Sequence, residues 1–184
     1  MKSVYYTLTT TAFGNVAVVW RQDDGAPAIV KICLPGESVR TDNLVQQSFP
    51  GAGKRSHSNV DKVCGQILEY LAGDAVQFSL DILDMSMCTG FQRNILNQAW
   101  LIPKGMVSTY RRLAERSRTP GGARAVGNAL ANNPYPIIIP CHRVIRADGA
   151  LGGFGGGLEM KKTLLGMEGV VFDAKGNVLP QFLW

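Results

Sequence analysis

The sequence has no hydrophobic stretch long enough to cross a membrane. No run approaches the roughly 18 apolar residues that a membrane-spanning helix needs, and residues 1–11 lack the apolar region of a signal peptide. Cysteine is also scarce: Cys33, Cys64, Cys88 and Cys141 are too few and too widely spaced for a disulfide framework. These absences favour a reduced, soluble protein of the cytoplasm, without a membrane partner.

Metal-ligand clusters, internal repeats and low-complexity segments are missing from the sequence as well. Cys33, His57 and Cys64 do not fall into a compact ligand spacing, so no metal site is expected. The composition, 46% hydrophobic and 18% charged over 184 residues, suffices for the core of one ordinary domain or of two small ones.

Acidic residues are nearly absent from one part of the chain. Between Lys104 and Arg146, eight lysines and arginines accompany a single acid, Glu115. Residues 1–84, by contrast, hold 7 basic and 9 acidic residues. A basic block favours a polyanionic partner, because binding to phosphates releases counterions. A solvated basic face is the alternative.

The first 84 residues have the pattern of a small mixed α/β domain with an antiparallel sheet. Runs of β-branched and aromatic residues separated by turn residues predict strands at 4–10, 15–20 and 28–34. Residues 35–57, rich in Pro, Gly, Ser and Gln, are expected to form a long loop. A helix is predicted from Ser58, with Asp61 in a capping-box variant, to Gly73, and alternation over 76–82 predicts a further strand.

The pattern becomes helical after Asp84, where the domain boundary is placed, giving domains 1–84 and 85–184. Thr89 and Gln92 form a capping box for a helix that Pro103 ends. Two short helices are predicted next, at about 109–116 and from Thr119 to about 132, with Pro120 at the first helical position. Two helices joined by a tight turn are typical of a helix-turn-helix.

The second of these helices begins with small residues. Its first turns read Gly121-Gly122-Ala123-Arg124-Ala125-Val126-Gly127, with one long polar side chain. Such a surface lets backbone approach nucleic acid closely but offers little base readout, so weak sequence specificity and a special role for Arg124 are expected. The alternative is a tight helix-packing face.

The string Pro140-Cys141-His142-Arg143-Val144 contains the residues best suited to covalent chemistry. Cys141 lies beside a histidine and near Arg143 and Arg146, so it is a candidate thiolate of lowered pKa, whereas the other cysteines are expected to be inert. His142 is compatible with a general base, a DNA contact or a satisfied polar residue.

Several motifs occur together between Thr89 and Glu168. They are Thr89-Gly90-Phe91-Gln92, Ile102-Pro103-Lys104-Gly105, Ser108-Thr109-Tyr110, Ala123-Arg124-Ala125-Val126-Gly127, Asn133-Pro134, Ile139-Pro140-Cys141-His142-Arg143-Val144 and the loop Gly152–Gly157. On these motifs the chain resembles the methylated-DNA–protein-cysteine methyltransferases, the alkylguanine-DNA alkyltransferase family. The resemblance implies an α+β fold, with a ribonuclease-H-like N-terminal domain and a mostly helical, winged-helix-like C-terminal domain.

The resemblance also implies catalytic roles. Cys141 would take the alkyl group from the 6-oxygen of guanine in an in-line displacement, activated by His142 through a water, with Glu168 orienting the imidazole. Tyr110 would donate a hydrogen bond or proton to the guanine ring, and Asn133 would hold the turn before the active-site strand.

Substrate contacts follow from the same resemblance. Backbone N–H groups around Phe154, Gly155 and Gly156 would bind the guanine oxygen, and the carbonyls of Cys141 and Val144 would accept from its exocyclic amine. No cofactor is needed, and 4-O-alkylthymine is a second expected substrate. The alkyl thioether is not hydrolysed, so each molecule would act once.

The partner implied is double-stranded DNA, bound in the minor groove with low sequence specificity. The base would be flipped out and Arg124 would fill the gap; Ala123, Gly127, Thr109 and Tyr110 complete the expected DNA contacts. A monomer without a protein partner is expected, in the cytoplasm, or in the nucleus of a eukaryote.

The sequence departs from the family at two positions of the loop. Gly155 stands where relatives often have a hydroxyl, and Phe154 stands where some have tyrosine. Two other hypotheses remain for comparison: a non-catalytic helix-turn-helix protein that binds lesions or regulates, and a Cys–His hydrolase with multiple turnovers.

Overall fold

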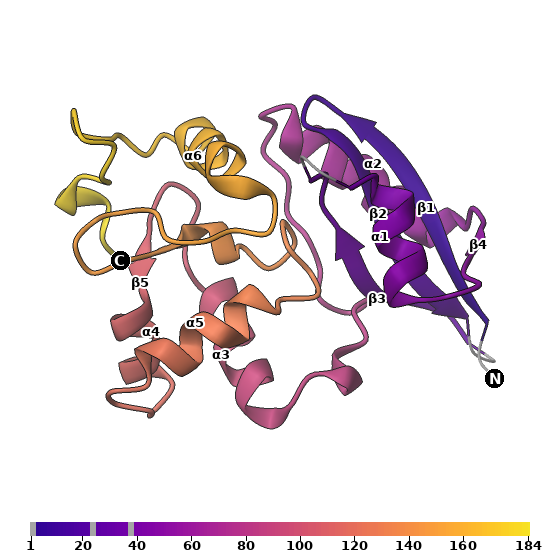
Figure 1. Ribbon diagram of the computed structural model, residues 1–184, viewed down its shortest axis with the longest axis horizontal. Helices are drawn as coiled ribbons and strands as arrows, with labels where there is room; N and C mark the ends of the chain where they lie inside the picture. The colour runs from indigo at the N-terminus through magenta and orange to yellow at the C-terminus, as the bar shows by residue number, and fades with distance from the viewer. Residues whose placement is uncertain (1–2, 23–24, 37–38) are drawn as a thin grey trace. The chain divides into compact units, whose positions relative to one another are not determined.

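The computed structural model describes residues 3–22, 25–36 and 39–184, and it divides into two compact units (Figure 1). We call Met1–Met87 unit 1 and Cys88–Trp184 unit 2. Within the described residues, no helix has both the length and the apolar character to cross a membrane.

Unit 1 is built on a four-stranded sheet. Strands β1 (Val4–Thr11), β2 (Gly14–Gln22) and β3 (Pro27–Cys33) form an antiparallel meander, and the short β4 (Gly53–Lys54) pairs parallel with β1. The order is therefore β3-β2-β1-β4. The three strands predicted from β-branched runs are confirmed to within one or two residues at each end.

Two helices flank this sheet. Helix α1 (Thr41–Ser48) lies in front of it in Figure 1, and α2 (Ser58–Leu71) lies behind it. Ala17 and Val19 of β2 pack with Val45 of α1 in one buried cluster. Because side chains alternate along a strand, the other face of β2 is left for α2, whose own buried side chains repeat at helical spacing.

The predicted loop over 35–57 is wrong in part, because α1 and β4 lie within it. Only Thr41 and Val45 of α1 are buried, so its polar composition belongs to the exposed face of a short helix. Tertiary contacts hold it, among them the Thr41 hydroxyl, which donates to the Asn15 carbonyl at 2.6 Å. Residues 37–38 of the predicted loop fall outside the described residues.

The predicted strand over 76–82 is also wrong. Only the end of this segment is bonded to β3: the Ile29 amide donates to the Ile82 carbonyl at 2.7 Å, and Leu83, just after the segment, forms an isolated bridge with Ile29. Its alternation reflects packing, since Phe78 lies against Tyr70 of α2 at 5.8 Å between ring centroids. The predicted capping box of Ser58 and Asp61 is wrong as well, because the N-cap of α2 is His57, whose Nδ1 accepts from the Asn59 amide at 3.2 Å.

Unit 2 is mostly helical. Its helices are α3 (Gly90–Trp100), α4 (Tyr110–Arg116), α5 (Ala123–Ala131) and α6 (Gly157–Met167), with a 3-10 turn at Cys141–Arg143. The predicted cap of α3 is confirmed, since the Thr89 hydroxyl accepts from the Gln92 amide at 3.1 Å. Helix α5 begins at Ala123 rather than at Pro120, because Gly121 (φ +79°) belongs to the preceding turn. Helix α6 was not predicted.

A two-stranded parallel sheet connects distant parts of unit 2. Strand β5 (Ser108–Thr109) pairs with β6 (Val144–Ile145). Tyr110 follows β5 directly, and the turn carrying Cys141 and His142 directly precedes β6. The small sheet therefore positions the start of α4 and the cysteine motif relative to each other.

Candidate active site

Cys141 lies on the wall of a cavity in unit 2. The cavity has a volume of about 330 Å³, and Cys141, which is partly exposed, is one of its lining residues. Its lining residues come from α4, α5, the cysteine motif and the glycine-rich loop: Tyr110, Gly127, Leu130, Ala131, Cys141, Gly153, Phe154 and Gly155. Four of the separate motifs in the sequence thus meet around one thiol.

The thiol of Cys141 differs from the sequence-based prediction. Burial raises the pKa of Cys141 above its ordinary value of 9.0, against the opposing effects of Asn133 and Lys161. The expected cationic neighbours are engaged elsewhere, since Arg143 pairs with Glu168 and Arg146 pairs with Asp148. The prediction of a lowered pKa is therefore wrong, and the resting group is a thiol that needs a base.

His142, the residue after Cys141, forms a buried pair with Glu168. His142 is fully buried, and its Nε2 lies 3.2 Å from Oε1 of Glu168. Burial lowers the pKa of His142 below its usual 6.5, so the ring is neutral near pH 7. A neutral imidazole is the form that accepts a proton.

Arg143 fixes Glu168 in place. Its guanidinium donates to both carboxylate oxygens, from Nε at 2.9 Å and from Nη2 at 2.6 Å, and its Nη1 donates to the Ile102 carbonyl at 2.7 Å. Burial alone would raise the pKa of Glu168, but the hydrogen bonds from His142 and Arg143 hold it well below its usual range. The carboxylate is thus charged and held in a fixed orientation toward His142.

Asn133 closes the turn between α5 and the cysteine motif. Its Nδ2 donates to the Ile139 carbonyl at 3.1 Å, and its Oδ1 accepts from the Tyr135 amide at 2.9 Å. The turn includes Ile137 at φ 75°, an uncommon conformation for a β-branched residue, which these bonds stabilise.

Tyr110 and the glycine-rich loop approach each other closely across the cavity. A Cβ atom at Gly152 (φ +68°) would lie 2.9 Å from the Tyr110 hydroxyl, so glycine is required there. Burial raises the pKa of Tyr110, and the phenol stays protonated as a hydrogen-bond donor. Gly156 is the N-cap of α6, which places Phe154 and Gly155 just before a helix N-terminus.

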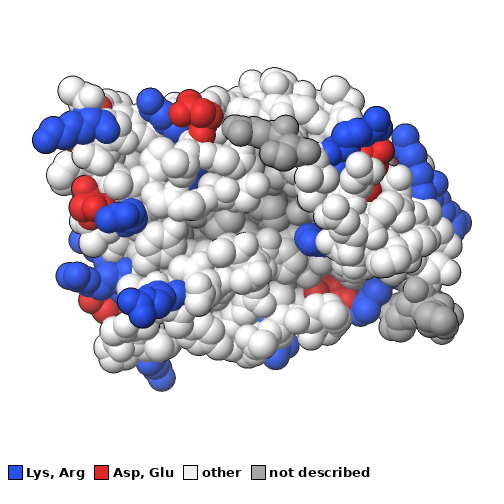
Figure 2. All heavy atoms as spheres, viewed as in Figure 1, with Lys and Arg blue, Asp and Glu red and all other residues white. Residues whose placement is uncertain are grey.

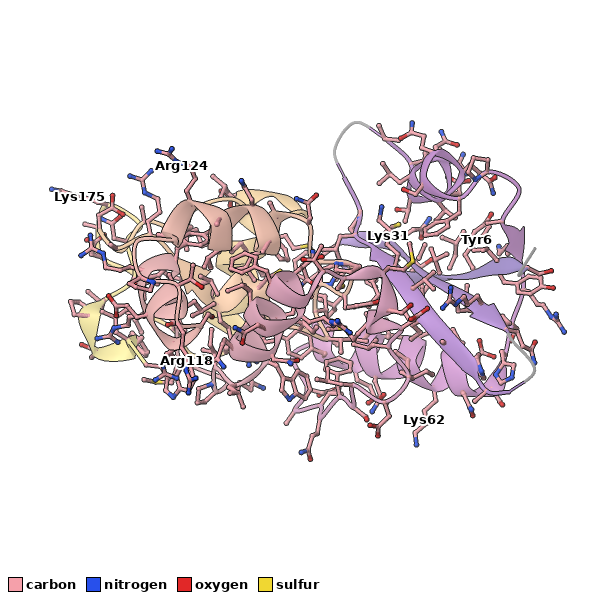
Figure 3. All side chains as sticks on the ribbon, turned by 90° about the horizontal axis from the view of Figure 1, so that it is seen from below. Tyr6, Lys31, Lys62, Arg118, Arg124 and Lys175 are labelled. Carbon is pink, nitrogen blue, oxygen red and sulfur yellow. The ribbon has the colours of Figure 1, made fainter. Side chains whose placement is uncertain are left out.

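Arg124 projects from α5 into solvent, among small residues. Figure 3 shows Arg124 and Lys175 on one side of unit 2 and Arg118 on the opposite side. Thr109, by contrast, is buried, and its hydroxyl accepts from the Arg112 amide at 3.1 Å as the N-cap of α4. The structure therefore places Arg124 on an open face and directs the Thr109 side chain inward.

Much of the basic block binds within the protein. Arg116 lies over the Trp184 ring at 3.5 Å, and Arg112 donates to the Trp184 carbonyl at 2.9 Å. With the ion pairs of Arg143 and Arg146, four of its eight cations have internal partners. In Figure 2 the basic side chains of unit 2 are accordingly spread over the face shown rather than gathered into one patch.

Lys161 was missed by the sequence analysis. It is fully buried on α6, and its Nζ donates to the carbonyls of Val144, Leu151 and Gly153. A usable signal exists, because Lys161, Leu164, Leu165 and Glu168 recur at helical spacing, which places the lysine on the buried face. Among the described residues, no group of three or more His, Cys, Asp or Glu could hold a metal ion.

Fold and site together define a class of protein. It is an α+β protein whose second unit has a cavity lined by a cysteine and by residues of two short helices, and the residue after the cysteine is the histidine of a buried histidine–glutamate pair. A family model, "6-O-methylguanine DNA methyltransferase, DNA binding domain", matches residues 90–170. The methylated-DNA–protein-cysteine methyltransferase of Methanothermobacter thermautotrophicus is 38% identical over 161 residues, 88% of this chain and 83% of that protein. The chain therefore belongs to the methylated-DNA–protein-cysteine methyltransferase family.

Further relatives and solved structures are similar to this chain over one half or more of its length. The enzyme of the same name from Mycolicibacterium paratuberculosis is 45% identical over 103 residues, 56% of this chain and 61% of that protein. The crystal structure of a Mycobacterium tuberculosis O6-methylguanine methyltransferase matches with a TM-score of 0.72 at 30% identity, covering 90% of this chain and 92% of that one. A Mycobacterium tuberculosis OGT in complex with DNA matches with the same TM-score and identity, covering 89% and 92%.

Proposed function

We propose that this protein repairs 6-O-alkylguanine in duplex DNA by transferring the alkyl group to its own Cys141, and that it accepts 4-O-alkylthymine as well. The observation that carries the proposal is the placement of Cys141. Cys141 lines a cavity, and the next residue in the chain, His142, is buried, neutral and bonded to Glu168. No cofactor takes part in this reaction.

The chemistry is a displacement at the alkyl carbon. His142, through a water, takes the proton of the Cys141 thiol, and the sulfur attacks the alkyl carbon in line with the bond to the guanine oxygen. The sulfur–carbon bond forms as the carbon–oxygen bond breaks, and the electron pair stays on the guanine. Tyr110 gives its proton to the guanine ring, and the proton on His142 later restores the phenol through solvent. The thioether is stable, so each molecule acts once.

The guanine is held by backbone groups. The N–H groups of Phe154, Gly155 and Gly156, just before the α6 N-terminus, bind the oxygen as charge develops on it. The carbonyls of Cys141 and Val144 accept from the exocyclic amine. Gly155 adds no hydroxyl, so backbone alone supplies the contacts to the oxygen.

DNA binds to unit 2 through α5. The small residues Ala123 and Gly127 let the helix enter the minor groove, and Arg124 occupies the space that the flipped nucleotide leaves. Sequence specificity is low because one long side chain reaches the bases.

Residues 85–184 form the DNA-binding and alkyl-acceptor domain, winged-helix-like in type. The strand order β3-β2-β1-β4 supports a ribonuclease-H-like assignment for residues 1–84. The protein acts as a monomer.

Replacement of Cys141 by alanine tests the proposal. The Cys141→Ala protein is expected to bind a duplex containing 6-O-methylguanine as tightly as the unaltered protein while repairing none of it. Repair that survives the substitution would overturn the role of Cys141. A protein that binds the lesion and never reacts, with or without Cys141, would indicate a lesion sensor, and repeated turnover would indicate a hydrolase.

A further inference from the structure

Lys161 is a buried cation that donates hydrogen bonds to three backbone carbonyls. Its Nζ lies 2.7 Å from the Val144 oxygen, 2.5 Å from the Leu151 oxygen and 3.3 Å from the Gly153 oxygen, and the side chain has no exposed surface. Three ammonium hydrogens thus meet three acceptors. One acceptor is Val144, the last residue of the cysteine motif and the first of β6, and the other two belong to the segment that leads into Phe154.

The segment held by Lys161 is intrinsically pliable. Residues 152–157 contain five glycines and one phenylalanine, and this composition gives the backbone wide conformational freedom. Gly153 and Gly155 are exposed, and neither would meet an atom within 4 Å if it carried a Cβ, so side-chain packing does not fix them. An external tie is needed if the amides of this loop are to be preorganised.

Burying an ammonium among carbonyls is costly, and a methionine of similar length would fill the same space without desolvating a charge. The next residue, Lys162, is exposed on the same helix and contributes a charge to the surface, whereas the buried Lys161 does not. Solubility therefore does not explain the charge at Lys161. The buried charge is explained if holding the loop contributes to function.

We propose that Lys161 is the positioning residue of the active-site loop: by joining Leu151 and Gly153 to Val144, it holds the N–H groups of Phe154–Gly156 where the guanine oxygen needs them. The inference rests on the proposed function, since it assigns a support to the same site. Lys161 acts through the loop and touches neither sulfur nor substrate.

The charge of Lys161 has a second consequence. Burial lowers the pKa of Lys161 to about 8, and the electrostatic effect of ionising the Cys141 thiol opposes this shift. Its other titratable neighbour is His142, whose Glu168 partner is already held by Arg143. Above that pH the amine keeps two hydrogens for three carbonyls, so the loop is held less firmly.

The test compares Lys161→Met and Lys161→Gln with the matched control Lys162→Met. Single-turnover transfer is measured with 6-O-methylguanine as the free base and within a duplex, and duplex affinity is measured separately. We expect both Lys161 variants to react roughly tenfold or more slowly per folded molecule with either substrate, because small displacements of preorganised groups cost rates of that order. Duplex affinity and the Lys162→Met rates are expected to stay unchanged.

Equal rates per folded molecule would overturn the inference and leave a purely structural lysine. Amide hydrogen exchange of residues 152–157 supplies a readout independent of transfer: exchange faster in Lys161→Gln than in the unaltered protein supports the tie, and equal exchange contradicts it.

If neither variant folds, titration of Lys161 by NMR in the unaltered protein decides. Protection of residues 152–157, corrected for the intrinsic base catalysis of exchange, that falls as the Lys161 amine is deprotonated supports the tie, and protection that stays constant through this deprotonation overturns it. Absence of transfer by the unaltered protein would refute the proposed function alone.

Discussion

At the scale of single residues, Glu168 shows what the sequence could and could not reveal. Its part in the site was expected from the family resemblance alone. Glu168 lies 26 residues after His142, and no local motif joins the two residues. Its tie to Arg143 was not expected, since Arg143 was counted as a free cation near Cys141. A one-dimensional sequence shows which charges are close in the chain, and the fold decides which of them pair.

Replacing Glu168 by glutamine is expected to destabilise the protein by about 3 kcal/mol, because Arg143 is left as a largely buried cation without its carboxylate. The carboxylate pKa lies below its unfolded value of 4.5, so its stabilising contribution is present above that pH and is lost as pH falls through and below it. Urea unfolding at neutral and acidic pH measures both effects. Glu159→Gln, on the exposed first turn of α6, is the control. Unchanged acid sensitivity in Glu168→Gln would contradict this account.

Gly152 gives a second prediction at the residue scale. An alanine there combines a positive φ with a Cβ 2.9 Å from the Tyr110 hydroxyl. We expect Gly152→Ala to lose about 1 kcal/mol of stability and to transfer alkyl groups roughly tenfold more slowly, as Tyr110 shifts. Gly153→Ala, where a Cβ meets nothing within 4 Å, is expected to be nearly neutral. Single-turnover rates of the pair decide, and equal rates would contradict the packing argument.

At the scale of elements, the helix pair α4–α5 was predictable and its electrostatics were not. Caps and apolar spacing located both helices, but Arg112 and Arg116 of α4 contact Trp184, which lies far along the chain. Helix α6 escaped prediction because glycines open it and a lysine sits on its buried face. Helix α1 escaped because it buries only two residues. Periodicity detects a helix most readily when a broad apolar face is buried; α1 lacks such a face, and in α6 the helical spacing of Met160, Leu164 and Leu165 is interrupted by Lys161.

The arginines of the two helices are expected to differ in DNA binding. Arg124→Ala should slow transfer from duplex DNA while leaving transfer from the free base unchanged, since the role proposed for Arg124 is to fill the space of the flipped nucleotide. Arg116→Ala should leave the salt dependence of duplex binding unchanged, because the guanidinium is stacked on Trp184; a phosphate contact would instead lower the slope by about one. Binding titrations across salt concentrations and stopped-flow transfer assays measure both. A reduced slope in Arg116→Ala would show that the stacked arginine is available to DNA.

At the scale of the whole molecule, the division of charge agrees with the division of structure. The acidic first half folds into a sheet with two helices, and the basic second half contains the cavity, the cysteine and the exposed Arg124. Composition and motif spacing predicted this organisation because each depends on local sequence. The raised pKa of Cys141 and the carbonyl partners of Lys161 depend on tertiary packing around β6 and α6, which no local pattern reports.

The account as a whole depends on one covalent event, and intact protein mass tests it most directly. The protein is mixed with a duplex carrying a single 6-O-methylguanine and then weighed and mapped. We expect a gain of one methylene group, never more than one per molecule even with excess duplex, located at Cys141. An unchanged mass with tight lesion binding, or conversion of many lesions by one molecule, would contradict the account.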